Sequence, residues 1–405
     1  MTTPTPEHIR KVWKILQERE QARMTISAPR SHRAPEQIFY SVMNSLRNKK
    51  HNRYSNILAY DRTAVVVHDD GYLNANVVCD SKGGWWVAAQ APPPESQHSF
   101  FYAIYSQSAS KQPSLLQAIP HIQVEKKGKR RSAIIVQLTG WEENGRPKAD
   151  PYLPETSTSP IIFKPPKSSH LPRLALRRES VESSKELSTD ISLLSLRPIS
   201  PISSSSISND KVGETNGRSI STSTDKLGAK NGLSTLTSND KEGEQTGIST
   251  SSSTFGMGEE IRSPTTTSTT GKKVEEILIW HYQFHGWPDH GIPSGQGVKS
   301  LVKLIQTVRE KRLQLGGDEC EVWVHCSAGV GRTGTFIVLS SLFSPSSSSA
   351  PSKPVFSPLG PLPSDIREDV VAFTVDSMRE WRGMLVQQPA QLGVIYDIYH
   401  SISSS

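Results

Sequence analysis

The sequence predicts an α/β fold, in which a single domain with a twisted, mixed β-sheet is flanked by helices and interrupted by a disordered insertion. Three observations support this prediction. Short apolar, β-branched stretches alternate with longer stretches whose apolar residues recur every three or four positions, an order typical of strands covered by helices. Only 35% of the 405 residues are hydrophobic, which is low for a chain that packs along its whole length. A long Ser/Thr-rich stretch interrupts the pattern in the middle of the chain.

The first part of the chain contains helices and strands in mixed order. Ile9, Val12, Trp13 and Leu16 form an apolar stripe that predicts a helix over residues 8–24. The other elements predicted before residue 155 are a helix at 35–46, strands at 63–67, 72–78 and 85–89, a helix starting at 100–105, and a central strand at 132–138.

The second part of the chain begins with an abrupt change of composition. Between Pro201 and Thr270, 29 of 70 residues are Ser or Thr. The other residues include too few apolar side chains for their burial to offset the conformational entropy lost on ordering. Motifs at Ser208, Ser223 and Ser238 repeat within this stretch, and we interpret them as disordered tandem duplication. The elements predicted around it are strands at 174–176, 191–196 and 277–284, helices at 297–313 and 365–384, and a last helix after Pro389.

These patterns divide the chain into four parts. Residues 1–34 are predicted to be an N-terminal helical segment, and residues 35–199 and 272–401 the α/β domain. Residues 200–271 are the predicted disordered insertion, which a domain tolerates because the cost of closing a loop grows only slowly with its length. Residues 344–363, rich in Ser and Pro, are predicted to be a surface loop within the domain.

Charge and cysteine content exclude several classes of protein. The net charge of +7 is spread along the sequence, so it forms no basic stripe of the kind that binds nucleic acid but suits anionic substrates. Three cysteines are too few for a disulfide framework and fit a reducing compartment. No stretch is apolar enough to resemble a signal peptide or a membrane span. We therefore expect a cytoplasmic protein, most simply a monomer.

A loop between a predicted strand and a predicted helix, at residues 322–337, contains the most informative residues. Residues 322–324 are apolar and predict the end of a buried strand. A glycine-rich loop that opens a helix points backbone N–H groups inward and binds anions. At its mouth Cys326 is expected to be a thiolate, and the planar guanidinium of Arg332 can bind two phosphate oxygens at once. The pattern predicts a cysteine that attacks phosphorus.

The segment His325-Cys326-x5-Arg332-Thr333 resembles the His-Cys-x5-Arg-Thr/Ser signature of the cysteine-dependent protein tyrosine phosphatases, of the non-receptor, tyrosine-specific type. This resemblance, which extends over about residues 35–155 and 272–400, implies a phosphatase-like fold, a cysteinyl-phosphate intermediate and no cofactor or metal. It also implies that His325 helps keep Cys326 ionised and that Thr333 hydrogen-bonds the departing thiolate. The residues whose amides would hold the phosphate oxygens are Ser327, Ala328, Gly329, Val330, Gly331 and Arg332.

Two further segments resemble loops of the same family. Trp287-Pro288-Asp289, between two glycines, resembles the mobile acid loop, so Asp289 would protonate the leaving phenolate and later activate water. The segment around Tyr54 resembles the phosphotyrosine recognition loop. There the Tyr54 ring would make the pocket too deep for phosphoserine, and Asn56 would hold the peptide backbone where the family commonly has Asp or Asn.

The remaining resemblances concern supporting residues. By a match to a third loop, Glu143 would orient the guanidinium of Arg332, and Lys148 would meet Asp289 when the acid loop closes. Gln387 and Gln391 match two glutamines that hold the attacking water in the family. Residues 71–76 and 88–92 resemble stretches that line the signature loop, although Ala91 and Ala64 replace a usual glycine and a usual arginine.

The sequence thus predicts a protein tyrosine phosphatase that acts on phosphotyrosyl proteins or peptides. Two alternatives remain open. A catalytically silent phosphotyrosine-binding module would bind but not hydrolyse its ligand, and an aryl phosphate assay would separate it from an enzyme. A dual-specificity or lipid phosphatase would have a shallow pocket, and comparing phosphotyrosine with phosphoserine peptides would identify it.

Overall fold

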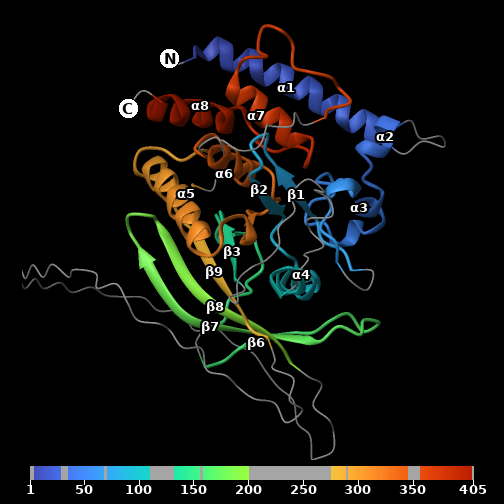
Figure 1. Cartoon of the computed structure of the whole chain (residues 1–405), viewed down its shortest axis with the longest axis vertical. Helices are drawn as coiled ribbons and strands as arrows, with labels where there is room; N and C mark the ends of the chain where they lie inside the picture. Colours follow the sequence, from blue (N-terminus) through green and yellow to red (C-terminus); the bar gives the residue numbers. More distant parts are fainter. Residues whose placement is uncertain are drawn as a thin grey trace, which may run out of the picture. The chain divides into compact units, whose positions relative to one another are not determined.

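The centre of the computed structural model is a mixed sheet of eight strands in the order β1-β2-β10-β3-β9-β8-β7-β6 (Figure 1). The structure describes residues 4–28, 35–67, 71–109, 132–155, 158–199, 275–288, 291–344 and 356–403. The strands of the sheet are β1 (Ala75–Cys79), β2 (Trp85–Ala89), β3 (Ser132–Gln137), β6 (Ile161–Phe163), β7 (Arg173–Ser184), β8 (Thr189–Ile199), β9 (Ile277–Phe284) and β10 (Glu321–His325). A separate small hairpin consists of β4 (Glu142–Glu143) and β5 (Arg146–Pro147).

The four central strands β2, β10, β3 and β9 are parallel, and the outer pairs are antiparallel. All residues of β2, β3 and β10 are buried, which fits their apolar, β-branched composition. His325 pairs with Ala89 on one side and with Gln137 on the other, and Gln137 pairs with Gln283. The carboxyl ends of these strands therefore share one edge of the sheet, and the loops that leave this edge form the site.

The helices cover both faces of the sheet (Figure 1). On one face α4 packs against β3, β7 and β9, where Phe100 meets Trp323 edge to face at 5.3 Å. On the other face α6 packs against β2 and β10, and α5, α7 and α8 pack in turn around α6. The helices are α1 (Pro6–Ser27), α2 (Pro35–Phe39), α3 (Met43–Arg47), α4 (Gln97–Ala109), α5 (Gln296–Gln314), α6 (Gly331–Leu342), α7 (Val370–Arg379) and α8 (Pro389–Ser403).

Helix α1 packs against α7 and α8 and belongs to the same compact unit as the sheet, although the sequence places residues 1–34 in a segment of their own. Its buried Arg23 lies 2.7 Å from Asp376 and 2.5 Å from Glu380. A second arginine of α1, Arg19, also pairs with Asp376 at 2.9 Å. Breaking a buried ion pair leaves an uncompensated charge, so these contacts hold α1 firmly on α7.

Three predicted elements have different bounds in the structure. The helix expected at 35–46 is two short helices, α2 and α3, because the Asp61 carboxylate accepts hydrogen bonds from Met43 N and Asn44 N and starts α3 anew. The helix expected at 365–384 is shorter, since the Asp369 side chain caps it by accepting from Ala372 N and it ends at Arg379. The strands expected at 174–176 and 191–196 extend into the long β7–β8 hairpin.

The prediction of a strand at residues 63–67 is wrong. A turn of 3-10 helix occupies Asp61–Thr63, and only Ala64 makes an isolated bridge to Asn76. The buried Thr63 hydroxyl donates to the Trp381 carbonyl at 2.5 Å, and its oxygen accepts from Asn76 at 2.9 Å. Side-chain hydrogen bonds of this kind compete with the backbone hydrogen bonds of a sheet. They explain why these residues form no strand despite their β-branched composition.

Several predictions fall outside the described residues. They are the insertion at 200–271, the repeat motifs within it, Asp289, and residues 345–355 of the Ser/Pro-rich loop. The described end of that loop includes residues 359–361, whose backbone carbonyls accept hydrogen bonds from Arg19 of α1.

Candidate active site

Cys326 lies directly after β10, at the bottom of a pocket of about 330 Å³. The Cys326 side chain is 5% exposed, and the Gly329 backbone N–H points at its sulfur at 3.3 Å. Gly329 has a φ of 73°, and a Cβ there would lie 2.1 Å from the Ala89 carbonyl oxygen, so only glycine fits this turn. The loop 327–330 then curves around the sulfur and opens α6.

Arg382 fixes this loop from behind, a role that the sequence did not reveal. Its buried guanidinium donates to the Gly329 carbonyl at 2.8 Å and to the Ala328 carbonyl at 3.2 Å. The same guanidinium donates to Asn76 and Asn74, both at 2.8 Å. Burial lowers the pKa of Arg382 to about 10, so it stays cationic at neutral pH. Arg382 thus binds two carbonyls of the loop, while the N–H of Gly329 points at the Cys326 sulfur.

The two stretches expected to line the loop do so. Asn74 and Asn76 come from the first of them and orient Arg382. In the second, Ala91 N donates to the Ser327 carbonyl at 3.0 Å, and Gln90 accepts from Arg53 N. The replacement of glycine by alanine at position 91 is accommodated, since Ala91 is fully buried there.

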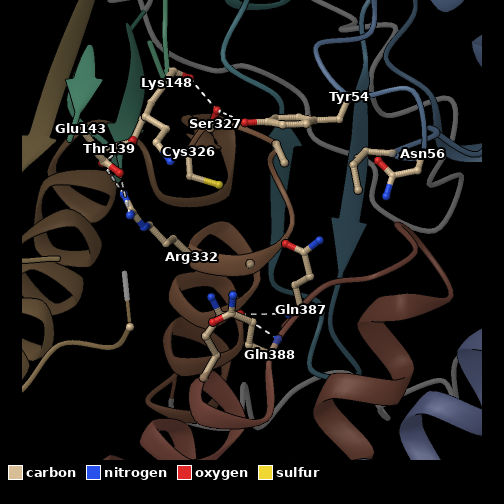
Figure 2. Close-up of a pocket in the computed structure, with 15 residues that line it drawn as sticks. Tyr54, Asn56, Thr139, Glu143, Lys148, Cys326, Ser327, Arg332, Gln387 and Gln388 are labelled. Carbon is tan, nitrogen blue, oxygen red and sulfur yellow. Dashed lines mark hydrogen bonds and ion pairs between the residues drawn. The ribbon is translucent and has the colours of Figure 1, made fainter. Parts of the chain in front are cut away.

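Glu143 pairs with Arg332, the residue that the loop resemblance assigns to it. Its two carboxylate oxygens lie 2.5 Å and 2.9 Å from the two terminal nitrogens of Arg332, and Thr139 donates to the same carboxylate (Figure 2). Glu143 precedes Asn144 and Gly145, whose φ values of 49° and 70° make the tight turn of the β4–β5 hairpin, a turn for which Asn-Gly is the preferred sequence. A bidentate pair of this kind fixes the guanidinium plane before any ligand arrives.

Tyr54 lines the pocket (Figure 2). Its hydroxyl lies 2.8 Å from Ser327 Oγ, and Ser327 donates in turn to the Lys148 carbonyl at 2.6 Å. Asn56 and Lys148 also line the pocket. The structure therefore brings the predicted recognition residues to the mouth of the cysteine loop.

His325 is fully buried, and burial lowers its pKa to about 4. Its Nδ1 lies 3.1 Å from the Cys326 carbonyl oxygen and its Nε2 lies 2.6 Å from the Tyr152 hydroxyl. A carbonyl can only accept, so Nδ1 carries the proton and Nε2 accepts from Tyr152. The ring is therefore neutral at neutral pH, and the expectation that His325 helps keep Cys326 ionised stays a prediction. The hydrogen bond from His325 Nδ1 to the Cys326 carbonyl holds the Cys326 backbone in place.

Thr333, Gln387 and Gln391 surround the loop on the α6 and α8 side. Within the described part of the chain the buried Thr333 hydroxyl has no hydrogen-bond partner, so the predicted bond to sulfur is not formed in this structure. Gln387 and Gln391 both line the pocket. The Gln391 side-chain oxygen accepts from Gln387 N at 2.9 Å and from Gln388 N at 3.2 Å. Gln391 thus fixes the backbone of the segment that presents Gln387.

The loop that contains Asp289 is anchored at both described ends. Trp287 is 5% exposed and donates its indole N–H to the Gly291 carbonyl at 3.2 Å. The Pro288 carbonyl accepts from Arg332 at 3.2 Å. Asp289 itself lies outside the described residues, so its predicted pairing with Lys148 stays a prediction.

The chain matches the family model described as protein-tyrosine phosphatase over residues 48–116 and 256–401. The chain belongs to the protein-tyrosine phosphatase family. The matched residues contain the cysteine loop, the Tyr54 loop, the acid loop and both glutamines. Helix α1 precedes the matched residues, and the whole β7–β8 hairpin lies between the two matched parts.

Relatives and solved structures agree with this family. The chain is 46% identical over 65 residues, 16% of its length, to tyrosine-protein phosphatase corkscrew of Drosophila virilis. It is 46% identical over 72 residues, 18% of its length, to receptor-type tyrosine-protein phosphatase epsilon of Rattus norvegicus. These stretches span only 8% and 10% of the two relatives. Within the described residues, none of the helices has the length and apolarity to cross a bilayer.

Two solved phosphatases of trypanosomes share the fold. The protein tyrosine phosphatase TcPTP1 of Trypanosoma cruzi superposes with a TM-score of 0.57 at 21% identity, covering 98% of this chain and 91% of that one. The Trypanosoma brucei enzyme TbPTP1 superposes with a TM-score of 0.54 at 20% identity, covering 98% of this chain and 94% of that one. At such identities the likeness supports the fold of a twisted sheet flanked by helices.

Proposed function

We propose that this protein hydrolyses phosphotyrosine in proteins or peptides through a phosphorylated Cys326. One observation supports this function above the others: a cysteine sulfur lies beneath an inward-facing amide, in a pocket that Arg332 lines and Tyr54 borders. Amides and a guanidinium supply positive field where the negative charge of a transferring phosphoryl group develops.

In the first step the Cys326 thiolate attacks phosphorus and the bond to the phenolic oxygen breaks. Arg332 and the amides of residues 327–332 hold the three equatorial oxygens, and Asp289 gives its proton to the leaving oxygen. The support for this arrangement is the bidentate hold of Glu143 on Arg332 and the outward turn of the loop carbonyls toward Arg382.

In the second step water attacks the phosphorus of the cysteinyl-phosphate. The phosphorus–sulfur bond breaks, sulfur leaves as thiolate, and Asp289 takes the proton from water. Gln387 positions this water, supported by its place on the pocket wall, and the Thr333 hydroxyl, buried without a partner among the described residues, is available to the departing sulfur.

Tyr54 gives the pocket its depth. Its hydroxyl contact with Ser327 holds the ring beside the loop. A phosphotyrosyl side chain reaches the sulfur past this ring, whereas a phosphoseryl side chain is too short. This favours a tyrosine phosphatase over a dual-specificity or lipid phosphatase, and the presence of Cys326 and Arg332 favours an enzyme over a silent binding module.

The test compares phosphotyrosyl and phosphoseryl versions of one peptide on the full chain and on the Cys326→Ser variant. We expect turnover of the phosphotyrosyl peptide alone by the unmodified chain, and retained binding without turnover by the variant. Turnover by Cys326→Ser would refute the nucleophile, and equal rates on both peptides would refute the tyrosine specificity.

A further inference from the structure

The segment that presents Gln387 contains two unusual backbone conformations. Met384 has a φ of 62° and Val386 a φ of 60°. The left-handed region is unfavourable for residues other than glycine, most of all for a β-branched one such as Val386. Such conformations persist only where the surroundings impose them, and they cluster at functional sites. The groups that impose them here are therefore informative.

Arg379, at the end of α7, holds the carbonyls of this segment. Its fully buried guanidinium donates to the Leu385 carbonyl and to the Val386 carbonyl, both at 2.8 Å. Its third contact is with α1, where it donates to the Leu16 carbonyl at 2.8 Å. On the opposite side Val386 N donates to the Val330 carbonyl of the cysteine loop at 3.1 Å. The segment therefore lies between the cysteine loop and α1.

Glu20 of α1 also contacts the segment that presents Gln387. Glu20 is 6% exposed, and its Oε1 accepts from Met384 N at 3.0 Å. Its other oxygen, Oε2, lies 3.6 Å from Arg23 and 3.8 Å from Arg379, so the carboxylate is compensated by two buried cations. A Cβ added at Gly383 would lie 3.0 Å from Glu20 Oε1 and 2.8 Å from the Tyr60 hydroxyl, which shows how closely α1 approaches this turn.

From these contacts we infer that Glu20 is a positioning residue for the second chemical step, acting through the Met384–Val386 turn on Gln387. The inference rests on the proposed function. Helix α1 lies outside the residues that match the family model, yet through Glu20 it contacts the turn that presents Gln387. In the first step the cysteine, Arg332 and the acid loop act without Gln387, so a displaced Gln387 slows mainly the attack of water on the cysteinyl-phosphate, in which the phosphorus–sulfur bond breaks and sulfur leaves.

The experiment measures burst kinetics of the full chain with para-nitrophenyl phosphate. In Glu20→Ala we expect the rapid burst of nitrophenol to keep its rate constant, while the steady-state kcat falls about ten-fold, because misplacing a positioned group by a fraction of an ångström costs that much or more. Since the second step then limits, kcat should become independent of the leaving group across a series of aryl phosphates. Glu20→Gln keeps an oxygen that can accept from Met384 N and should restore most of the rate.

Three further variants separate positioning from loss of the fold. Glu18→Ala, at an exposed position of the same helix, should leave both phases unchanged. Gly383→Ala keeps the Glu20 side chain but displaces Glu20 or Tyr60, because its Cβ would lie too close to both. It should therefore reproduce the Glu20→Ala kinetics, and it tests the inference independently if Glu20→Ala does not fold. Combined with Gln387→Ala, Glu20→Ala should add little further loss, since the two act on one step.

The outcomes distinguish the two proposals. If the unmodified chain turns over no aryl phosphate, the proposed function is overturned, and the role of Glu20 with it. If the unmodified chain is active and Glu20→Ala or Gly383→Ala slows the burst as much as the steady state, α1 serves the fold alone and the inference is overturned. Unchanged kinetics in these variants overturn it equally.

Discussion

At the scale of single residues, the site depends on arginines whose directions are set by fixed acceptors. Arg332 is held on both terminal nitrogens by Glu143, and Arg382 is held by two carbonyls and two asparagines. A guanidinium that is oriented before the substrate binds loses little entropy on binding it.

Glu143→Ala should lower kcat/KM for an aryl phosphate about ten-fold or more, because Arg332 loses its bidentate partner and samples other orientations. Inorganic phosphate should also inhibit the variant less strongly, since the same guanidinium binds it. Glu142→Ala is the matched control, as Glu142 is the exposed neighbour on the same hairpin. Equal kcat/KM in the two variants would contradict the role of Glu143.

The positions of Cys326, Arg332, Glu143 and Tyr54 could be predicted from short motifs. In each motif the neighbouring residues determine the local backbone. Arg382 could not be predicted in this way. Arg382 donates hydrogen bonds to carbonyls some 50 residues earlier in the chain. The sequence shows only an arginine next to Trp381 in an otherwise buried stretch. The neutral state of His325 likewise has no local sequence signal, since the burial of the ring depends on Tyr152 and the surrounding core.

At the scale of elements, the acid loop joins β9 to α5. Its described ends are connected by the Trp287 indole and the Gly291 carbonyl, and Gly291 has a φ of 115°. Only glycine adopts such a backbone readily. The loop thus has a stiff, tryptophan-anchored start and a flexible glycine at its far end, which is suited to a segment that moves.

Asp289→Ala should lower kcat for aryl phosphates with poor leaving groups by about two to four orders of magnitude, the usual contribution of a general acid. The loss should shrink for leaving groups that depart without a proton. The measurement is kcat across phenols of increasing pKa, and Asp150→Ala offers a comparison at a carboxylate paired with Arg53. A loss independent of the leaving group would remove Asp289 from the role of acid.

Elements with clear periodicity were predicted well, and those formed by long-range contacts were not. The strand at β9 has the predicted bounds, and α5 differs by one residue at each end. The β7–β8 hairpin was underestimated because the outer half of β7 is exposed and polar, so it lacks an apolar alternation. Helices α2 and α3 were merged because the carboxylate that divides them, Asp61, comes from a distant turn.

At the scale of the whole molecule, the strand ends that flank residues 200–274 and the loops that form the pocket lie at opposite ends of β9. β8 ends at Ile199 and β9 begins at Ile277, with Leu196 paired to Ile277. The pocket loops leave the other end of β9, beyond Phe284, roughly 25 Å further along at the usual rise of a strand. The described ends of β8 and β9 next to this segment therefore lie at the end of β9 opposite to the pocket loops.

Removing residues 200–271 should leave kcat and KM for a small aryl phosphate within about two-fold of the full chain, because the flanking strands are adjacent and a short loop can join them. The comparison is steady-state kinetics of both chains at equal active-site concentration. A large gain in activity on deletion would show instead that the insertion obstructs the pocket.

Acid should destabilise the fold through its buried histidines. His325 has a folded pKa of about 4, below the ordinary value near 6.5, so between these pH values the unfolded chain binds a proton that the folded chain does not. The free energy of unfolding therefore falls as pH decreases through this window, by about 3 kcal/mol at roughly 1.4 kcal/mol per pKa unit. Burial lowers the pKa of His281 as well, with the same sign.

Urea denaturation at pH 7 and pH 4.5 measures this loss. His281→Gln should flatten the dependence on pH, whereas His170→Gln, at an exposed position, should leave it unchanged. Equal stability at the two pH values would contradict the neutral, buried state of these rings.

The most direct test of the whole account locates the phosphoryl group during turnover. The full chain is mixed with a phosphotyrosyl peptide, quenched in acid within milliseconds, digested and analysed by mass spectrometry. We predict one phosphoryl group per active chain, attached to the sulfur of Cys326. Phosphate on any other residue, or turnover with no phosphorylated enzyme at any quench time, would contradict it.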